Sequence, residues 1–165
     1  MQPTRILFVC LGNICRSPLA ESIFRHLARE RGVEDRFEID SAGTSGYHNG
    51  SPPDERSVAT ASNRGVEVVG RSRKLTGADL HDFDYVIVMD TDNLGGVNTV
   101  ATAVGGRAQV HRLREWDPEP DDYDVPDPYY GGPNGFETVH DLVHRSCEAL
   151  LDHLLSGGGE GEAAR

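Results

Sequence analysis

The sequence predicts a three-layer α/β domain, in which helices cover both faces of a central parallel sheet of about four strands. The runs at 6–9 and 85–89 are short and apolar, as expected of strands that are buried on both faces. Strand and helix patterns alternate along the chain, which is typical of a parallel sheet. A length of 165 residues suits one domain, which we place at 1–155, and a flexible glycine-rich tail is expected at 156–165.

The first strand, at 6–9, leads through a glycine-containing loop at 10–16 into the first helix. We assign Ser17 as the cap of this helix and Pro18 as its first residue, where the missing N–H costs nothing. The helix is expected to end before Gly32. Its buried face is defined by two rows of apolar residues at helical spacing: Leu19, Ile23 and Leu27, with Ala20, Phe24 and Ala28.

The remaining elements follow in chain order: a strand at 37–41, a helix from 54 to about 64, strands at 85–89 and 109–113, and a long closing helix. Gly65 is expected to stop the second helix, and the strand at 109–113 has the weaker pattern. The closing helix carries one apolar stripe: Phe136, Val139, Val143, Leu150 and Leu154. Cys147 lies on the same stripe, so we expect it to pack in the core.

The charge balance limits the partners that the protein can have. Sixteen basic residues against 27 acidic ones give a formal charge of −11. Nucleic acids and anionic membranes are therefore not expected as partners, because both require a basic surface, whereas a small anion responds to local groups. No apolar run approaches the roughly 18–20 residues of a membrane span, and the start of the chain lacks a secretory signal. We therefore expect a cytoplasmic protein.

Two common classes of site do not fit the sequence. The single lysine, Lys74, precedes Leu75, which excludes a Walker-type nucleotide loop. Three cysteines are too few for a disulfide scaffold, and the spacing of Cys10 and Cys15 is not usual for zinc, so we expect no metal site. One acidic stretch has no basic residue, and a solvated loop is the expected role of most of it: Glu115, Asp117, Glu119, Asp121, Asp122, Asp124 and Asp127.

The loop after the first strand carries the candidate chemistry. It reads Cys10-Leu11-Gly12-Asn13-Ile14-Cys15-Arg16-Ser17 and joins a buried strand to a helix N-terminus, where ligands sit in open α/β sheets. Backbone N–H groups, the helix dipole and Arg16 could together hold a tetrahedral oxyanion. The same field favours the thiolate of Cys10, with a hydrogen bond from Ser17. The alternative is a buried cysteine beside an ion-paired arginine, because Cys-x5-Arg alone is a weak signal.

The whole segment 9–18 resembles the phosphate-binding loop of low-molecular-weight protein tyrosine phosphatases. Four more stretches resemble motifs of that family in the family's order: Ser41-Ala42-Gly43-Thr44, Asp54-x-Arg56, Phe83-Asp84-Tyr85 with Met89-Asp90, and Asp127-Pro128-Tyr129-Tyr130. The resemblance covers about residues 5–155.

The resemblance implies a flavodoxin-like fold and metal-independent hydrolysis of phosphotyrosine, without a cofactor. Cys10 would attack phosphorus to form a phosphocysteine intermediate, Arg16 would hold the phosphoryl oxygens, and Asp127 would act as general acid and then as base. The implied phosphate-binding residues are Leu11, Gly12, Asn13, Ile14, Cys15, Arg16 and Ser17. Tyrosine-phosphorylated proteins are the implied partners, and phosphate or other oxyanions the implied competitive ligands.

Further residues are implied to shape the site. Asn13, Ser17 and Ser41 resemble residues that brace the loop by hydrogen bonds. The implied wall of the cleft, an aromatic slot that favours a phenyl phosphate over the shorter phosphoserine, consists of Leu11, Tyr47, His48, Tyr129 and Tyr130. Cys15 is the candidate redox partner of Cys10, and Asp90 is expected to end a strand outside the catalytic set.

The chain departs from the family pattern at two positions, since many members have tryptophan in place of Tyr47 and histidine in place of Gly70. Three other functions remain as alternatives. Arsenate reductases share the loop type but need a cysteine relay, and no cysteine lies between Cys15 and Cys147. Protein-arginine phosphatases typically carry threonine where Ile14 stands. A catalytically silent phosphotyrosine-binding module would fail an assay with nitrophenyl phosphate.

Overall fold

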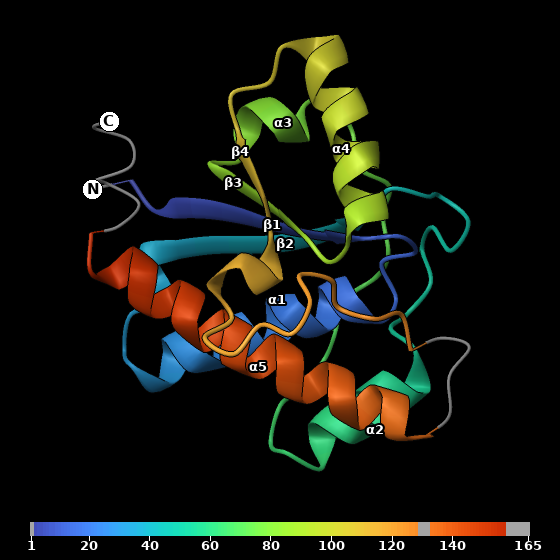
Figure 1. Cartoon of the computed structure of the whole chain (residues 1–165), viewed down its shortest axis with the longest axis vertical. Helices are drawn as coiled ribbons and strands as arrows, with labels where there is room; N and C mark the ends of the chain where they lie inside the picture. The colour runs from blue at the N-terminus through green and yellow to red at the C-terminus, as the bar shows by residue number, and fades with distance from the viewer. Residues whose placement is uncertain (1, 129–132, 158–165) are drawn as a thin grey trace.

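The computed structural model, which describes residues 2–128 and 133–157, contains one parallel sheet with the strand order β2-β1-β3-β4. Figure 1 shows helices on both faces of this sheet, which confirms the predicted fold class. The strands are β1 (Thr4–Cys10), β2 (Phe37–Gly43), β3 (Tyr85–Val88) and β4 (Gln109–Arg112), and each lies within two residues of its predicted bounds.

The two helical layers bury alternate residues of β1. Ile6 and Phe8 face the layer formed by α1 (Arg16–Glu30), α2 (Glu55–Ser62) and α5 (Pro133–Leu155), drawn below the sheet in Figure 1. Leu7 and Val9 face the opposite layer, formed by α3 (Asp79–Asp82) and α4 (Thr91–Val104). Both faces of the strand are therefore buried, which explains its continuous apolar run.

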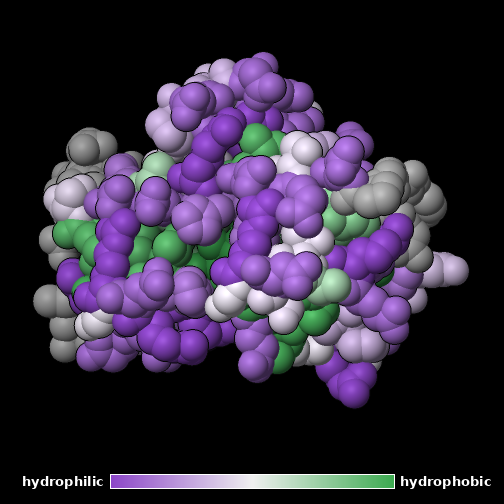
Figure 2. All heavy atoms as spheres, turned by 90° about the horizontal axis from the view of Figure 1, so that it is seen from below, coloured by the Kyte–Doolittle hydropathy of each residue, from purple (hydrophilic) through white to green (hydrophobic). Residues whose placement is uncertain are grey.

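The remaining elements are two short 3₁₀ turns, η1 (Glu34–Arg36) and η2 (Leu113–Trp116). Cys147 is fully buried in the core between α1 and α5, as expected. In Figure 2, the outer face of the layer that contains α5 is covered mainly by hydrophilic side chains, with apolar ones visible between them. Within the described residues, no helix is long and apolar enough to cross a membrane.

The start of α1 differs from the prediction. The helix begins at Arg16, its N-cap residue is Cys15, and no side chain caps it. Ser17 and Pro18 both lie inside the first turn, where a missing proline N–H is still tolerated. Ser17 is not the cap because its hydroxyl is engaged by the loop that precedes the helix.

Helix α4 has no counterpart in the sequence prediction. Gly95 and Gly96 lie in its first half and hide the helical pattern, since glycine is a poor helix former. The helix is started by Asp90, whose carboxylate accepts a hydrogen bond from the Asn93 N–H at 2.7 Å. It ends at Gly105, which adopts the left-handed conformation with φ of 64°.

The strand order places the site. Chain connections leave β1 and β3 toward opposite faces of the sheet, so a crevice opens at their carboxyl ends. The loop 10–16 lies at this crevice and is tied to the residues after β2, because Thr44 N–H donates to the Cys10 carbonyl at 3.0 Å and Ser45 N–H to the Leu11 carbonyl at 2.9 Å.

Candidate active site

The loop after β1 curls around the thiol of Cys10, of which only 3% is exposed. Asn13 N–H donates to Cys10 Sγ at 3.3 Å, and Ser17 Oγ lies 3.0 Å from the same sulfur. Asn13 adopts the left-handed backbone conformation, with φ of 57°, which asparagine tolerates better than most residues. This conformation is what lets the loop aim a backbone N–H at the sulfur.

The hydroxyl of Ser17 is oriented by its neighbours. Asn13 Nδ2 can only donate, and it lies 2.8 Å from Ser17 Oγ, so the serine oxygen accepts there. The hydroxyl hydrogen is then free to point at Cys10 Sγ, which is closer, at 3.0 Å, than the Ala42 carbonyl at 3.4 Å. A hydroxyl that donates to sulfur stabilises its thiolate form.

Arg16 is buried, and three groups hold its guanidinium. Nη1 donates to Asp90 Oδ2 at 2.6 Å and to the Val125 carbonyl at 2.9 Å, and Nη2 lies 3.5 Å from Asp127 Oδ2. Burial opposes the charge of Arg16, but the nearby Cys10, Asp90 and Asp127 outweigh burial and raise its pKa. The arginine is thus permanently charged beside the thiol.

Asp90 is a residue that the sequence analysis left outside the site. Its Oδ2 pairs with Arg16 while its Oδ1 caps α4, so one carboxylate fixes both the arginine and a helix start. Its position directly after the β3 region, at the carboxyl edge of a buried strand, is the sequence signal that could have found it.

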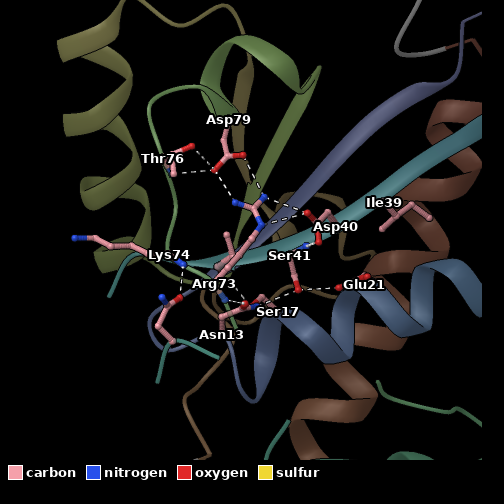
Figure 3. Close-up of polar contacts among 12 residues, drawn as sticks. Asn13, Ser17, Glu21, Ile39, Asp40, Ser41, Arg73, Lys74, Thr76 and Asp79 are labelled. Carbon is pink, nitrogen blue, oxygen red and sulfur yellow. Dashed lines mark hydrogen bonds and ion pairs between the residues drawn. The ribbon is translucent and has the colours of Figure 1, made fainter. Parts of the chain in front are cut away.

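The loop is braced from behind by a chain of hydrogen bonds (Figure 3). Asn13 Nδ2 donates to Ser41 Oγ at 3.0 Å, and Ser41 Oγ donates to Glu21 Oε1 at 2.7 Å. The structure therefore brings Asn13, Ser17 and Ser41 together as expected and adds Glu21, from the second turn of α1. All three expected members are buried.

Arg73 also supports the loop, through the side-chain oxygen of Asn13. Its backbone N–H donates to Asn13 Oδ1 at 2.9 Å, and its guanidinium reaches Asp40 at 3.1 Å and Asp79 at 3.0 Å (Figure 3). Gly70, where many family members have histidine, adopts φ of 115°, and a Cβ there would meet nothing within 4 Å. A cavity of about 70 Å³ adjoins it, bounded in part by Glu21 and Ser41. Independently of position 70, the Ser41 hydroxyl donates to Glu21.

A pocket of about 80 Å³ opens above the thiol. It is lined by Cys10, Leu11, Gly12, Ile14, Cys15, Arg16, Ser45, His48 and Asp127. The side chain of Asp127 is 37% exposed, so the carboxyl borders both the pocket and water. Burial, followed by the nearby charges of Asp54, Cys10 and Asp127, raises the pKa of the Cys15 thiol.

The expected aromatic wall is only partly present among the described residues. Leu11 and His48 line the pocket. Tyr47 does not: it occupies a tight turn closed by Asn49 N–H and the Gly46 carbonyl at 3.0 Å, which leaves it 87% exposed. Its ring packs edge-on against His48, with centroids 4.8 Å apart. Tyr129 and Tyr130 lie outside the described residues.

No group of three or more histidine, cysteine, aspartate or glutamate side chains in residues 2–128 and 133–157 could hold a metal ion. The functional groups that do converge are two thiols, a guanidinium, several loop amides and one carboxyl group, contributed by the β1 loop and by the segment before α5, with Ser45 and His48 from the segment after β2. A thiolate under a ring of hydrogen-bond donors can act as a nucleophile toward a bound oxyanion.

Comparisons with known proteins agree with this chemistry. The profile of the family described as low molecular weight phosphotyrosine protein phosphatase matches residues 5–157. The low molecular weight protein-tyrosine-phosphatase YfkJ of Bacillus subtilis is 44% identical over 147 residues, which are 88% of this chain and 92% of that protein. The human low molecular weight phosphotyrosine protein phosphatase is 40% identical over 148 residues, covering 89% and 93% of the two chains.

Solved structures show the same likeness. The crystal structure of YfkJ superposes with a TM-score of 0.88, covering 94% of this chain and 97% of that one at 41% identity. The arginine phosphatase DARP of Drosophila superposes with a TM-score of 0.86, covering 90% of this chain and 96% of that one at 32% identity.

Proposed function

Since the chain belongs to the low molecular weight phosphotyrosine protein phosphatase family, a family of cysteine-dependent, metal-independent enzymes, we propose that Cys10 is its nucleophile, Arg16 its phosphate-binding cation and Asp127 its general acid. One observation carries the assignment. The Cys10 sulfur receives hydrogen bonds from the loop and opens into the pocket that Arg16 and Asp127 border.

In the first step, a lone pair of Cys10 Sγ forms a bond to phosphorus as the bond from phosphorus to the tyrosine oxygen breaks. Asp127 gives its proton to the departing phenolate oxygen. Arg16 and the N–H groups of residues 11–17 bind the three equatorial oxygens, where negative charge is carried through the transition state.

In the second step, Asp127, now a carboxylate, takes a proton from water as the water oxygen bonds to phosphorus. The sulfur–phosphorus bond breaks, phosphate leaves and Cys10 returns as thiolate. The Ser17 hydroxyl and the Asn13 N–H stabilise the sulfur as the leaving group, which is why we assign Asn13, Ser17 and Ser41 a bracing role.

The proposed substrates are tyrosine-phosphorylated proteins, with phosphate and other oxyanions as competitive ligands. A phenyl ring above the sulfur would contact Leu11 and His48, which both line the pocket. We propose Tyr129 and Tyr130 as further wall residues on the strength of the motif that contains them.

The assignment is tested by Cys10→Ser, assayed on a phosphotyrosine peptide and on nitrophenyl phosphate with and without a chelator. We expect a folded protein whose turnover falls to background, because a serine hydroxyl ionises far less readily than a thiol. Wild-type activity should not respond to the chelator. Retention of more than about a tenth of wild-type turnover, against the large loss expected for a nucleophile, would contradict the role of Cys10. Faster turnover of a phosphoarginine peptide would contradict the substrate class.

We also propose that the enzyme is redox-sensitive and works in the reducing cytoplasm, where its three free cysteines stay reduced. Cys10 and Cys15 line the same pocket. Because burial raises the pKa of Cys15, that thiol stays protonated at neutral pH, so hydrogen peroxide oxidises Cys10 first. The sulfur becomes a sulfenic acid with loss of water, and Cys15 then displaces a second water to form a disulfide.

The redox proposal is tested by peroxide treatment followed by thiol reductant. Wild type should regain its activity, whereas Cys15→Ser should stay active beforehand and fail to recover afterwards. Peptide mapping without reductant should show Cys10 linked to Cys15. Recovery of Cys15→Ser to the wild-type level, or oxidised protein without this link, would refute the proposal.

A further inference from the structure

The acidic segment 117–127 is folded around one buried arginine. Arg114, in η2, immediately precedes the acidic stretch, and only 2% of its side chain is exposed. Its Nε donates to Asp117 Oδ2 at 3.1 Å, its Nη2 pairs with Asp121, and its Nη1 donates to the Asp124 carbonyl at 2.8 Å. A single guanidinium therefore holds the beginning, the middle and the end of the segment.

The far end of the segment leads directly into the active site. The Asp124 carboxylate accepts hydrogen bonds from the Thr91 N–H and hydroxyl, both at 2.9 Å. Val125 N–H donates to the Met89 carbonyl at 2.7 Å, and the Val125 carbonyl accepts from Arg16 at 2.9 Å. Asp127 follows two residues later. The place at which Arg114 fixes the Asp124 carbonyl is thus three residues from the proposed general acid.

Other cations near the segment do not duplicate this arrangement. Arg145, from α5, binds Asp117 through Nε at 2.8 Å, and its Nη2 reaches Asp117 and the Glu119 carbonyl. Arg112 lies 3.9 Å from the Asp124 carboxylate at the surface. Of the described basic residues, Arg114 alone contacts both Asp117 and Asp124.

The carboxylates of Asp117 and Asp121 both pair with the guanidinium of Arg114. Burial opposes the charge of Asp117, whose side chain is fully buried, but hydrogen bonds from Arg145, the Glu119 backbone and Arg114 lower its pKa. Removing the guanidinium would leave Asp117 with Arg145 as its remaining arginine partner, Asp121 without its ion pair to Arg114, and the Asp124 carbonyl without this donor. The Asp124 end would keep its bonds to Thr91, Met89 and Arg16 but lose the cation that ties it to Asp117 and Asp121.

We propose that Arg114 is a positioning residue for the reaction, which sets the reach of Asp127 into the pocket by clamping the segment that carries it. The inference rests on the proposed role of Asp127 as general acid. It assigns a catalytic purpose to an acidic stretch that composition alone describes as a solvated loop.

The experiment measures kcat/KM for aryl phosphates with good and poor leaving groups, nitrophenyl phosphate and phenyl phosphate, because kcat/KM reports the first phosphoryl transfer. For Arg114→Gln we expect a loss that is roughly tenfold larger on phenyl phosphate, a fraction of the 10²–10⁴ that a positioned acid supplies. Arg145→Gln is the matched control, since it removes an Asp117 partner without touching the Asp124 end. Any loss of kcat/KM in this variant should be equal on the two substrates.

Two further variants make the outcome decisive. Asp127→Asn should show the same bias, that is, a larger loss of kcat/KM on phenyl phosphate than on nitrophenyl phosphate. The double variant Asp127→Asn with Arg114→Gln should show no larger bias than Asp127→Asn alone. If Asp127→Asn shows no bias, the proposed acid is wrong. If Asp127→Asn shows it and Arg114→Gln does not, the clamp is wrong. Should Arg114→Gln fail to fold, Arg114→Lys replaces it: equal losses on both substrates would overturn the inference, and a smaller bias of the same sign would support it.

Discussion

Asp90 decides how the guanidinium of Arg16 is presented to the pocket. Arg16 Nη1 lies 2.6 Å from Asp90 Oδ2, and this carboxylate is also the N-cap of α4. A neutral amide in its place could still accept one hydrogen bond but would no longer carry the charge that orients the arginine. The site therefore relies on a residue that does not itself line the pocket.

We predict that Asp90→Asn lowers kcat/KM by roughly tenfold, because a charge-assisted hydrogen bond of about 1.5–3 kcal/mol is replaced by a neutral one of about 0.5–1.5 kcal/mol. The inhibition constant of inorganic phosphate should rise in parallel. Asp92→Asn, in the same first turn of α4 but exposed, is the matched control and should behave like wild type. An unchanged phosphate inhibition constant in Asp90→Asn would show that Arg16 is oriented without it.

At the level of residues, the sequence reveals what lies in one continuous segment. Cys10, Asn13, Arg16 and Ser17 fall within eight positions, so their motif is legible before any fold is known. Partners such as Asp90 come from elements that only the folded sheet brings together, so the end of β3 marks Asp90 as a candidate without revealing that it binds Arg16. Tyr47 shows the converse, because the motif places it at the pocket whereas a local turn directs it to solvent.

At the level of elements, the end of β2 determines the shape of the phosphate loop. Gly43 is the last residue of β2, and a Cβ built on it would lie 2.7 Å from the Leu11 carbonyl oxygen. Its N–H donates to the Arg73 carbonyl at 2.9 Å and its carbonyl accepts from Leu75 at 2.8 Å, so the strand cannot move away freely. The loop would have to shift instead.

We predict that Gly43→Ala lowers kcat/KM by roughly tenfold or more while the fold persists, because misplacement of a catalytic group by about 1 Å can cost as much as 10². Gly95→Ala is the matched control: no atom lies within 4 Å of its built Cβ, and it sits inside α4. Alanine there should raise stability by about 0.5–1 kcal/mol without changing activity. Thermal melts and kinetics on both variants check this, and normal kinetics for Gly43→Ala would refute the close contact.

Elements with strong periodicity are the ones that the sequence predicts well. The apolar run of β1 and the stripe of α5 appear at nearly the predicted places, since burial on both faces or along one stripe selects those patterns. Helix α4 was missed because its two glycines break the pattern, although tertiary packing of Leu94 and Val97 compensates for their low helix propensity.

At the level of the whole molecule, α5 carries a buried ionisable group that links stability to pH. His140 is 2% exposed, and its Nδ1 has no hydrogen-bond partner among the described atoms. Burial, followed by the charges of Arg64 and of His144, lowers the pKa of His140 to about 4, with Asp141 and Glu137 opposing the shift. The ring of His144 stacks on it with centroids 6.4 Å apart.

The sign of the pH dependence follows from that shift. A histidine in the unfolded chain titrates near its ordinary pKa of about 6.5, so the unfolded state binds a proton first as the pH falls. The His140 contribution to stability is therefore complete above about pH 6.5 and is lost progressively toward pH 4. At 1.36 kcal/mol per pKa unit, the loss approaches about 3 kcal/mol. The described carboxylates with lowered pKa, Asp54, Asp117 and Asp121, lose their contribution to stability only below about pH 5.

We predict that the free energy of unfolding of the wild type, measured with urea, decreases steadily between pH 6.5 and 4.5, and that His140→Gln removes most of this slope. Glutamine has no group that titrates there, so both states of the variant bind the same number of protons at this position. His26→Gln is the control, because His26 lies at the surface of α1, paired with Glu30 at 3.5 Å. If His140→Gln and wild type show parallel pH profiles, His140 takes up its proton in the folded state as readily as in the unfolded state. A hydrogen-bond acceptor would then have to reach the ring, whose Nδ1 has no partner among the described residues.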